Sequence, residues 1–201
     1  MTTTRLTASL LAAGALSVMA LGAASTASAG PITYHAELTG AAEFPSNASP
    51  GTGNAIVTFD DDADTLRVFV TFSGLTAPVT AAHIHCCTAF PLAGTVGVAT
   101  TTPTFTDFPG GVSAGTYDHT FDLTLPASFS AAFIAANGGT AAGAEAALGA
   151  GLAAGRSYLN IHTSAFPGGE IRGFLIPEPA SLALFGLGFA GLAAARRRQP
   201  G

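Results

Sequence analysis

The chain has 201 residues, of which 48% are hydrophobic and only 9% are charged, and its formal net charge at pH 7 is −5. It contains no lysine, and residues 30–176 hold eleven acidic side chains against three arginines. A surface of that sign repels phosphate backbones, which argues against nucleic acid as a partner. With both apolar ends set aside, the length of residues 30–176 suits one domain with its own core.

The first 29 residues have the pattern of a secretory signal peptide. Arg5 precedes an apolar run over residues 6–24, and Ala27, Ser28 and Ala29 form a small-x-small cleavage pattern. We therefore expect cleavage after Ala29 and export of the chain that follows. The alternative is a retained N-terminal anchor.

Apolar and polar residues alternate along most of the exported part, which predicts half-buried strands. Turns rich in glycine and proline separate these segments, and two alanine-rich segments, 128–137 and 140–154, predict one or two short helices. Many short strands with such turns predict an all-β fold, an antiparallel immunoglobulin-like or Greek-key β-sandwich. The expected strands are 32–38, 55–59, 66–72, a strand around His83, 96–100, 115–125, 157–162 and 170–175.

Four aspartates lie in the five residues 60–64, within the turn of the first expected hairpin. Hard cations such as calcium prefer carboxylate oxygens, but the spacing lacks the later Gly and Glu of an EF-hand loop. Acidic residues are also ordinary turn formers. We therefore expect a solvated turn.

Residues 80–88 place two of the five histidines and both cysteines within a few positions. In an extended strand, His83 and His85 point to one face, and Ile84 points to the other. Cys86 and Cys87 cannot staple distant parts of the chain together. They form a vicinal disulfide, stay reduced, pair between molecules or bind metal, with Cys87 on the same strand parity as the histidines.

A third histidine has the same disposition in the last expected hairpin. Leu159 and Ile161 share the core face of their strand, and His162 lies on the other face. If the two strands approach each other, His83, His85 and His162 converge on the outer face of the sheet. Copper and zinc both accept such a site. The alternative is that these imidazoles hydrogen-bond to backbone and neighbouring side chains and fix the strand ends.

Other polar residues carry little catalytic signal. Glu170 and Arg172 lie two residues apart on one expected strand and are predicted to form an exposed ion pair. The sequence has no serine or cysteine nucleophile signature, phosphate-binding glycine loop or cofactor fingerprint. A role that is not enzymatic is therefore favoured.

Near the C-terminus, Pro177, Glu178 and Pro179 precede sixteen almost wholly apolar residues, 180–195, and then three arginines, 196–198. This order resembles the PEP-CTERM sorting signal of Gram-negative bacteria. The resemblance implies a transient stay in the inner membrane, processing by an exosortase, and a final place in the cell envelope, on the surface or outside. The apolar stretch predicts a transmembrane helix with its arginines in the cytoplasm. A plain single-pass tail anchor is the alternative.

Four segments of the exported part occur in a recognisable order: residues 75–78 (Leu-Thr-Ala-Pro), 82–85 (Ala-His-Ile-His), 158–163 (Tyr-Leu-Asn-Ile-His-Thr) and 167–173 (Pro-Gly-Gly-Glu-Ile-Arg-Gly). This order resembles the CHRD domain, named from chordin. The resemblance implies an extracellular immunoglobulin-like β-sandwich. We therefore expect a signal peptide (1–29), a CHRD-like domain (30–176) and a sorting tail (177–201), in an envelope or matrix module that binds an extracellular polysaccharide or protein, or has a structural role.

A weaker similarity is to copper-zinc superoxide dismutases, in which a His-x-His strand supplies two copper ligands and a distant strand a third. Carried over, it makes His83, His85 and His162 the candidate copper ligands and gives a redox or metal-handling role as the alternative function. Residues 87–117 hold no second cluster of histidines with an aspartate, and no bridging histidine is present. Dismutase activity is therefore not expected, while simple copper binding is less affected.

Overall fold

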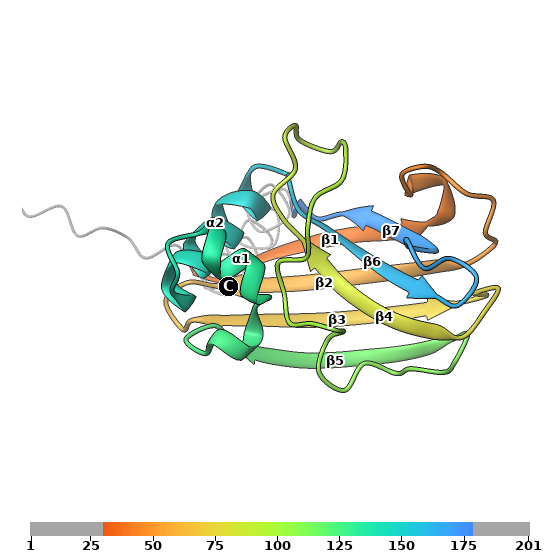
Figure 1. The fold of residues 1–201 in the computed structure, drawn as a ribbon, viewed down its shortest axis with the longest axis horizontal. Helices are drawn as coiled ribbons and strands as arrows, with labels where there is room; N and C mark the ends of the chain where they lie inside the picture. The colour runs from red at the N-terminus through yellow and green to blue at the C-terminus, as the bar shows by residue number, and fades with distance from the viewer. Residues whose placement is uncertain (1–29, 179–201) are drawn as a thin grey trace, which may run out of the picture.

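The structure is a computed structural model that describes residues 30–178. The predicted signal peptide and the predicted transmembrane stretch, 180–195, lie outside these residues. Within the described part, no helix is long and apolar enough to cross a membrane. The elements, in chain order, are β1 (Ile32–Thr39), η1 (Gly40–Ala42), β2 (Thr52–Asp60), β3 (Thr65–Ser73), β4 (Val79–His85), β5 (Gly115–Asp122), η2 (Pro126–Ser128), α1 (Ala131–Ala136), α2 (Ala141–Ala153), β6 (Tyr158–Thr163), β7 (Ile171–Phe174) and β8 (Ile176–Pro177), where η marks a 3-10 turn (Figure 1).

The strands form one antiparallel sheet in the order β4-β6-β7-β1-β2-β3-β5, and β8 pairs with the beginning of β1. The sheet curls between β7 and β1, so that β4, β6 and β7 form a second layer over β1, β2, β3 and β5 (Figure 1). Fully buried side chains from both layers form the core, among them Leu38, Val68, Ile84, Leu159 and Ile161. The predicted antiparallel β-sandwich is confirmed.

Buried and exposed side chains alternate along the strands, as the alternation of apolar and polar residues in the sequence predicts. In β1, Tyr34, Ala36 and Leu38 are buried, whereas His35 and Glu37 are exposed. Burying one face of each strand removes apolar surface from water at about 25 cal/mol per Å², and this gain fixes the register of each strand against its neighbours.

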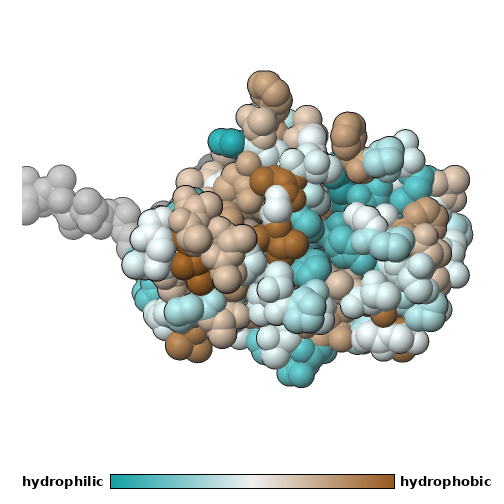
Figure 2. Space-filling view, viewed as in Figure 1, coloured by the Kyte–Doolittle hydropathy of each residue, from teal (hydrophilic) through white to brown (hydrophobic). Residues whose placement is uncertain are grey.

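The two α-helices lie together at one end of the sandwich (Figure 1). Each begins at a capping side chain: Ser130 Oγ accepts the Phe133 N–H at 3.1 Å, and Thr140 Oγ1 accepts the Gly143 N–H at 3.1 Å. Both helices are confirmed, with slightly narrower bounds than predicted. In the same view, hydrophobic residues gather over this end of the molecule, beside a more hydrophilic surface over the strands (Figure 2).

Two strand predictions need correction. Residues 96–100 form isolated bridges instead of a strand, one of which joins Val98 to His85, because this segment is part of a long loop that folds across the end of β4. β5 ends at Asp122 rather than at residue 125. Asp122 Oδ1 accepts the Thr124 N–H at 2.9 Å, which starts a turn and ends the pairing.

The described start of the sorting tail is held by β1. β8 pairs with Tyr34 and His35, and the Glu178 N–H donates to the Thr33 carbonyl at 2.9 Å. The Glu178 Oε1 also lies 2.5 Å from the His35 Nε2. Two residues of the predicted sorting motif, Pro177 and Glu178, therefore lie against the edge of the sandwich.

Candidate metal centre

The strand pairing brings the three predicted histidines to one face of the sheet. β4 and β6 are neighbours, with His83 opposite Asn160 and Ala81 opposite His162. His162 therefore lies diagonally next to His83, on the side of the sheet that faces away from Ile84 and the core. β4 and β6 therefore lie side by side, which is the condition under which the sequence predicts that the three histidines converge.

The three imidazole rings form a compact cluster. Their centroids are 5.3 Å apart for His83 and His162, 5.9 Å for His83 and His85, and 6.2 Å for His85 and His162. One ring nitrogen from each histidine lies within 4.8 Å of those of the other two. The three nitrogens are therefore close enough to be candidate ligands of one ion.

The cluster is covered, although it lies on the outer face of the sheet. His83 is 6% exposed and His85 is 8% exposed, and His162 is half-buried. The long loop after β4 covers the first two rings, because its Pro103 and Val96 carbonyls lie 2.7 and 2.8 Å from their ring nitrogens. The sequence predicts the face correctly but does not indicate this cover.

Backbone carbonyls set the tautomers of two of the rings. His83 Nε2 donates to the Pro103 carbonyl at 2.7 Å, and His162 Nδ1 donates to the Pro167 carbonyl at 2.9 Å. The other nitrogens, His83 Nδ1 and His162 Nε2, therefore carry lone pairs. Both are buried without a hydrogen-bond partner. Metal-binding histidines in proteins are commonly oriented in this way, by a hydrogen bond from the nitrogen that does not bind the metal.

The third ring has contacts at both nitrogens. His85 Nδ1 lies 2.8 Å from the Val96 carbonyl, and Nε2 lies 3.0 Å from the Asn160 Oδ1. Burial lowers the pKa of His85 and of His162, and it lowers the pKa of His83 to about 4. All three rings are therefore neutral at pH 7, so one His85 nitrogen also keeps a lone pair.

A buried arginine, Arg172 on β7, lies beside the cluster, because Asn160 is opposite both His83 on β4 and Arg172 on β7. The Tyr158 ring stacks on His85 with 4.7 Å between centroids, and the Arg172 guanidinium lies 4.8 Å from the Tyr158 centroid. Arg172 Nε is 3.8 Å from the Glu43 Oε2, and burial raises the pKa of Glu43 to about 7 although Arg172 opposes this shift. The predicted exposed pair of Glu170 with Arg172 is wrong, because loops bury both side chains and give them different partners.

The two cysteines do not join the histidines. β4 ends at His85, and Cys86 and Cys87 form a vicinal disulfide. Both sulfur atoms face α2, where the Ala147 carbonyl lies 3.4 Å from the Cys87 sulfur. Of the alternatives that the sequence leaves open, the structure shows the disulfide, which leaves no thiolate to bind a metal with the histidines.

Some members of the site carry little sequence signal. Asn160 shares strand parity with His162, so the alternation of β6 already places its side chain on the histidine face. The carbonyls of Val96, Pro103 and Pro167 have no such signal, because any residue has a backbone carbonyl and only the loop path aims it.

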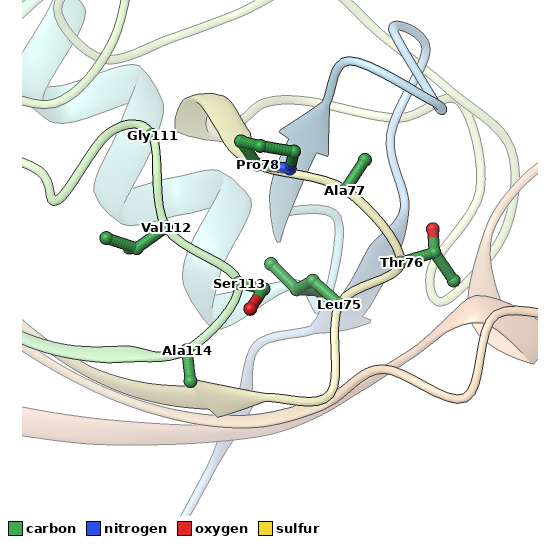
Figure 3. Close-up of a pocket in the computed structure, with 8 residues that line it drawn as sticks. All are labelled: Leu75, Thr76, Ala77, Pro78, Gly111, Val112, Ser113 and Ala114. Carbon is green, nitrogen blue, oxygen red and sulfur yellow. The ribbon is translucent and has the colours of Figure 1, made fainter.

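A cavity of about 540 Å³ lies elsewhere, where the segment before β4 meets residues 111–114 (Figure 3). The two segments are joined by backbone hydrogen bonds, among them Leu75 N–H to the Ser113 carbonyl at 3.1 Å. None of the lining residues has an ionisable side chain. The cavity therefore offers no chemistry comparable to that of the three histidines.

Two family models together match most of the chain. A family model described as CHRD domain matches residues 34–175, and a model described as PEP-CTERM protein-sorting motif matches residues 175–198. No curated protein and no solved structure matches the chain.

Proposed function

The chain belongs to the CHRD family and carries a PEP-CTERM sorting motif, and from this premise we propose that it is an envelope or extracellular-matrix module that acts by binding. The motif marks the chain for export to the cell envelope or surface of a Gram-negative bacterium. It also marks it for processing by exosortase, a membrane enzyme. The motif does not indicate what the exported domain binds, so we infer the ligand from the side chains of the domain.

The ligand that the geometry supports best is one transition-metal ion, copper or zinc, held by His83, His85 and His162. The observation that carries this proposal is the pair of buried ring nitrogens, His83 Nδ1 and His162 Nε2, that have no hydrogen-bond partner. An unpaired buried polar atom costs about 1–3 kcal/mol, which a metal–nitrogen bond would remove. If the histidines had only a structural role, burying these two nitrogens without a partner would lower the stability of the fold with nothing to offset it.

The donor set limits the ion and its chemistry. Three neutral imidazoles suit zinc or copper, and three protein ligands leave a further coordination position for water or a small ligand. Copper would add a redox role, whereas zinc would not. The lowered pKa values of the three rings favour metal binding, because a proton does not compete with the metal for the ring nitrogens at neutral pH.

Elemental analysis of the purified protein tests this proposal. After supply of copper or zinc and removal of free ion, we expect one metal per chain in the wild type. The substitutions His83→Ala and His162→Ala should each lower this ratio at least tenfold, because each removes one of three ligands. His119→Ala is the matched control, since His119 lies on β5 between Tyr117 and Phe121 and should leave the ratio unchanged.

The structural alternative makes a different prediction. If the histidines only hold the covering loop through the Pro103, Val96 and Pro167 carbonyls, the wild type binds much less than one metal per chain. The histidine substitutions then lower the melting temperature equally with and without metal. A full complement of metal that survives both substitutions would move the site elsewhere.

A further inference from the structure

The side chain of Asn160 lies among the three histidines. Asn160 is directly opposite His83 in the pairing of β4 with β6, and it is two residues before His162 on the same face of β6. Its Oδ1 lies 3.0 Å from the Nε2 of His85. The side chain is only 1% exposed, so its polar atoms depend on partners within the protein. Asn160 therefore offers the cluster an oxygen atom in addition to the three imidazoles.

Glu43 fixes which end of this amide faces the histidines. Burial raises the pKa of Glu43 to about 7, and the Asn160 amide is one of the groups that oppose this shift, because it donates to the carboxylate. Both side chains lie against Gly169, where a Cβ would overlap the Glu43 Oε1 and the Asn160 Nδ2. Reversing the amide would set its oxygen against the carboxylate. The oxygen of Asn160 is therefore the atom that faces His85.

The His85 ring faces an oxygen at each of its nitrogens. Its Nδ1 lies 2.8 Å from the Val96 carbonyl, and its Nε2 lies 3.0 Å from the Asn160 Oδ1. Burial lowers the pKa of His85, and a neutral imidazole has only one N–H. One of the two contacts therefore sets a nitrogen lone pair against an oxygen. Such a contact is repulsive unless a cation binds both atoms.

The shorter contact, to Val96, is the one that takes the proton. All three rings then follow one pattern, in which each ring donates to a backbone carbonyl and keeps a lone pair on its other nitrogen. The lone pairs are on His83 Nδ1, His85 Nε2 and His162 Nε2. Those of His83 and His162 have no partner, and that of His85 faces the Asn160 Oδ1. Four electron-pair donors therefore gather at one buried place.

We propose that the Asn160 Oδ1 is a fourth metal ligand and that the site binds a divalent ion, zinc or copper(II), in a closed shell. This inference rests on the three-histidine site proposed above and defines its ion. An amide oxygen is a hard donor, so it suits a divalent ion better than the soft copper(I). It takes the position that three histidines alone would leave open. Structural sites are closed in this way, so the ion would join β4 to β6 rather than activate water.

The zinc affinity of Asn160 variants tests the fourth ligand, measured at pH 8 by competition with a chromophoric chelator. Asn160→Leu removes the oxygen at nearly the same volume and should bind zinc at least tenfold more weakly than the wild type. Asn160→Asp keeps an oxygen there and should bind zinc at least as tightly as the wild type. Asn54→Leu removes an exposed amide on β2 and is the control, which should keep the wild-type affinity.

Cobalt(II), used as a spectroscopic substitute for zinc, reports the shell of the wild type and does not depend on the folding of a variant. Azide should leave the visible spectrum of the cobalt-loaded wild type unchanged, because no coordination position is open. A spectral change with azide, wild-type zinc affinity in Asn160→Leu, or an equal loss in Asn160→Leu and Asn160→Asp would overturn the fourth ligand and leave the three histidines as ligands. A wild type that binds neither zinc nor cobalt would overturn the three-histidine site as well.

Discussion

Glu170 joins two loops and the end of β6 through hydrogen bonds that its carboxylate accepts. Ser49 Oγ and Thr163 Oγ1 each donate to it at 2.6 Å, and Thr76 donates from its N–H at 2.7 Å and from its hydroxyl at 3.0 Å. Burial alone would raise the pKa of Glu170, but the donors from Ser49, Thr163 and Thr76 outweigh it and hold the pKa below its usual value. The ionised form is therefore the one that stabilises the fold.

This carboxylate gives a prediction for stability and its pH dependence. Glu170→Gln should lower the free energy of unfolding at pH 7 by about 2–3 kcal/mol, because the amide turns one acceptor of charge-assisted bonds into a donor. A lowered folded-state pKa contributes stability above the unfolded value near 4.5, and this contribution is lost as the pH falls through the folded value.

Urea unfolding at a series of pH values measures both effects. The wild type should lose stability as the pH falls below about 4.5, and Glu170→Gln should lose less over the same range, so that the two curves converge in acid. Glu37→Gln, at an exposed position, should run parallel to the wild type. A constant difference between Glu170→Gln and the wild type at every pH would contradict the role of the charge.

The helix α2 packs on the disulfide through a residue that has no side chain. A Cβ at Gly151 would overlap the sulfur atoms of Cys86 and Cys87, so helix and disulfide approach more closely than any other residue would permit. Gly151→Ala should gain about 1 kcal/mol of helix propensity. The overlap should cost more than that, because an overpacked core forces atoms apart.

We therefore expect Gly151→Ala to destabilise the protein by about 1–3 kcal/mol net, measured as a lower midpoint of denaturant unfolding. Gly168→Ala is the control, since a Cβ there meets no atom within 4 Å. If Gly151→Ala is as stable as the wild type or more so, the close packing of α2 on the disulfide is refuted.

Across the whole molecule, local patterns predict the elements and their faces well. The alternation in residues 32–38 predicts β1, and the shared parity of His83, His85 and His162 predicts that they lie on one face. Strand parity depends only on the chain itself, so the sequence carries it fully.

What the sequence does not predict depends on how loops and layers meet. Its position in the strand predicts that the Arg172 side chain is exposed, yet loops cover this face of the sheet and bury it. Arg172 therefore lies beside Glu43 and does not pair with Glu170. In the same way, the Pro103 carbonyl that orients His83 comes from a loop whose path has no periodic pattern. Burial of polar groups outside the core therefore has to be read from the structure.

The central claim is that this exported sandwich holds one transition-metal ion among three histidines of two neighbouring strands. Anomalous X-ray diffraction from crystals of the metal-loaded protein, collected at the copper or zinc absorption edge, tests it most directly. We predict a single strong peak about 2.0–2.1 Å from one ring nitrogen each of His83, His85 and His162. A metal-loaded crystal with no peak among these rings, or with its strongest peak elsewhere in the molecule, would contradict the claim.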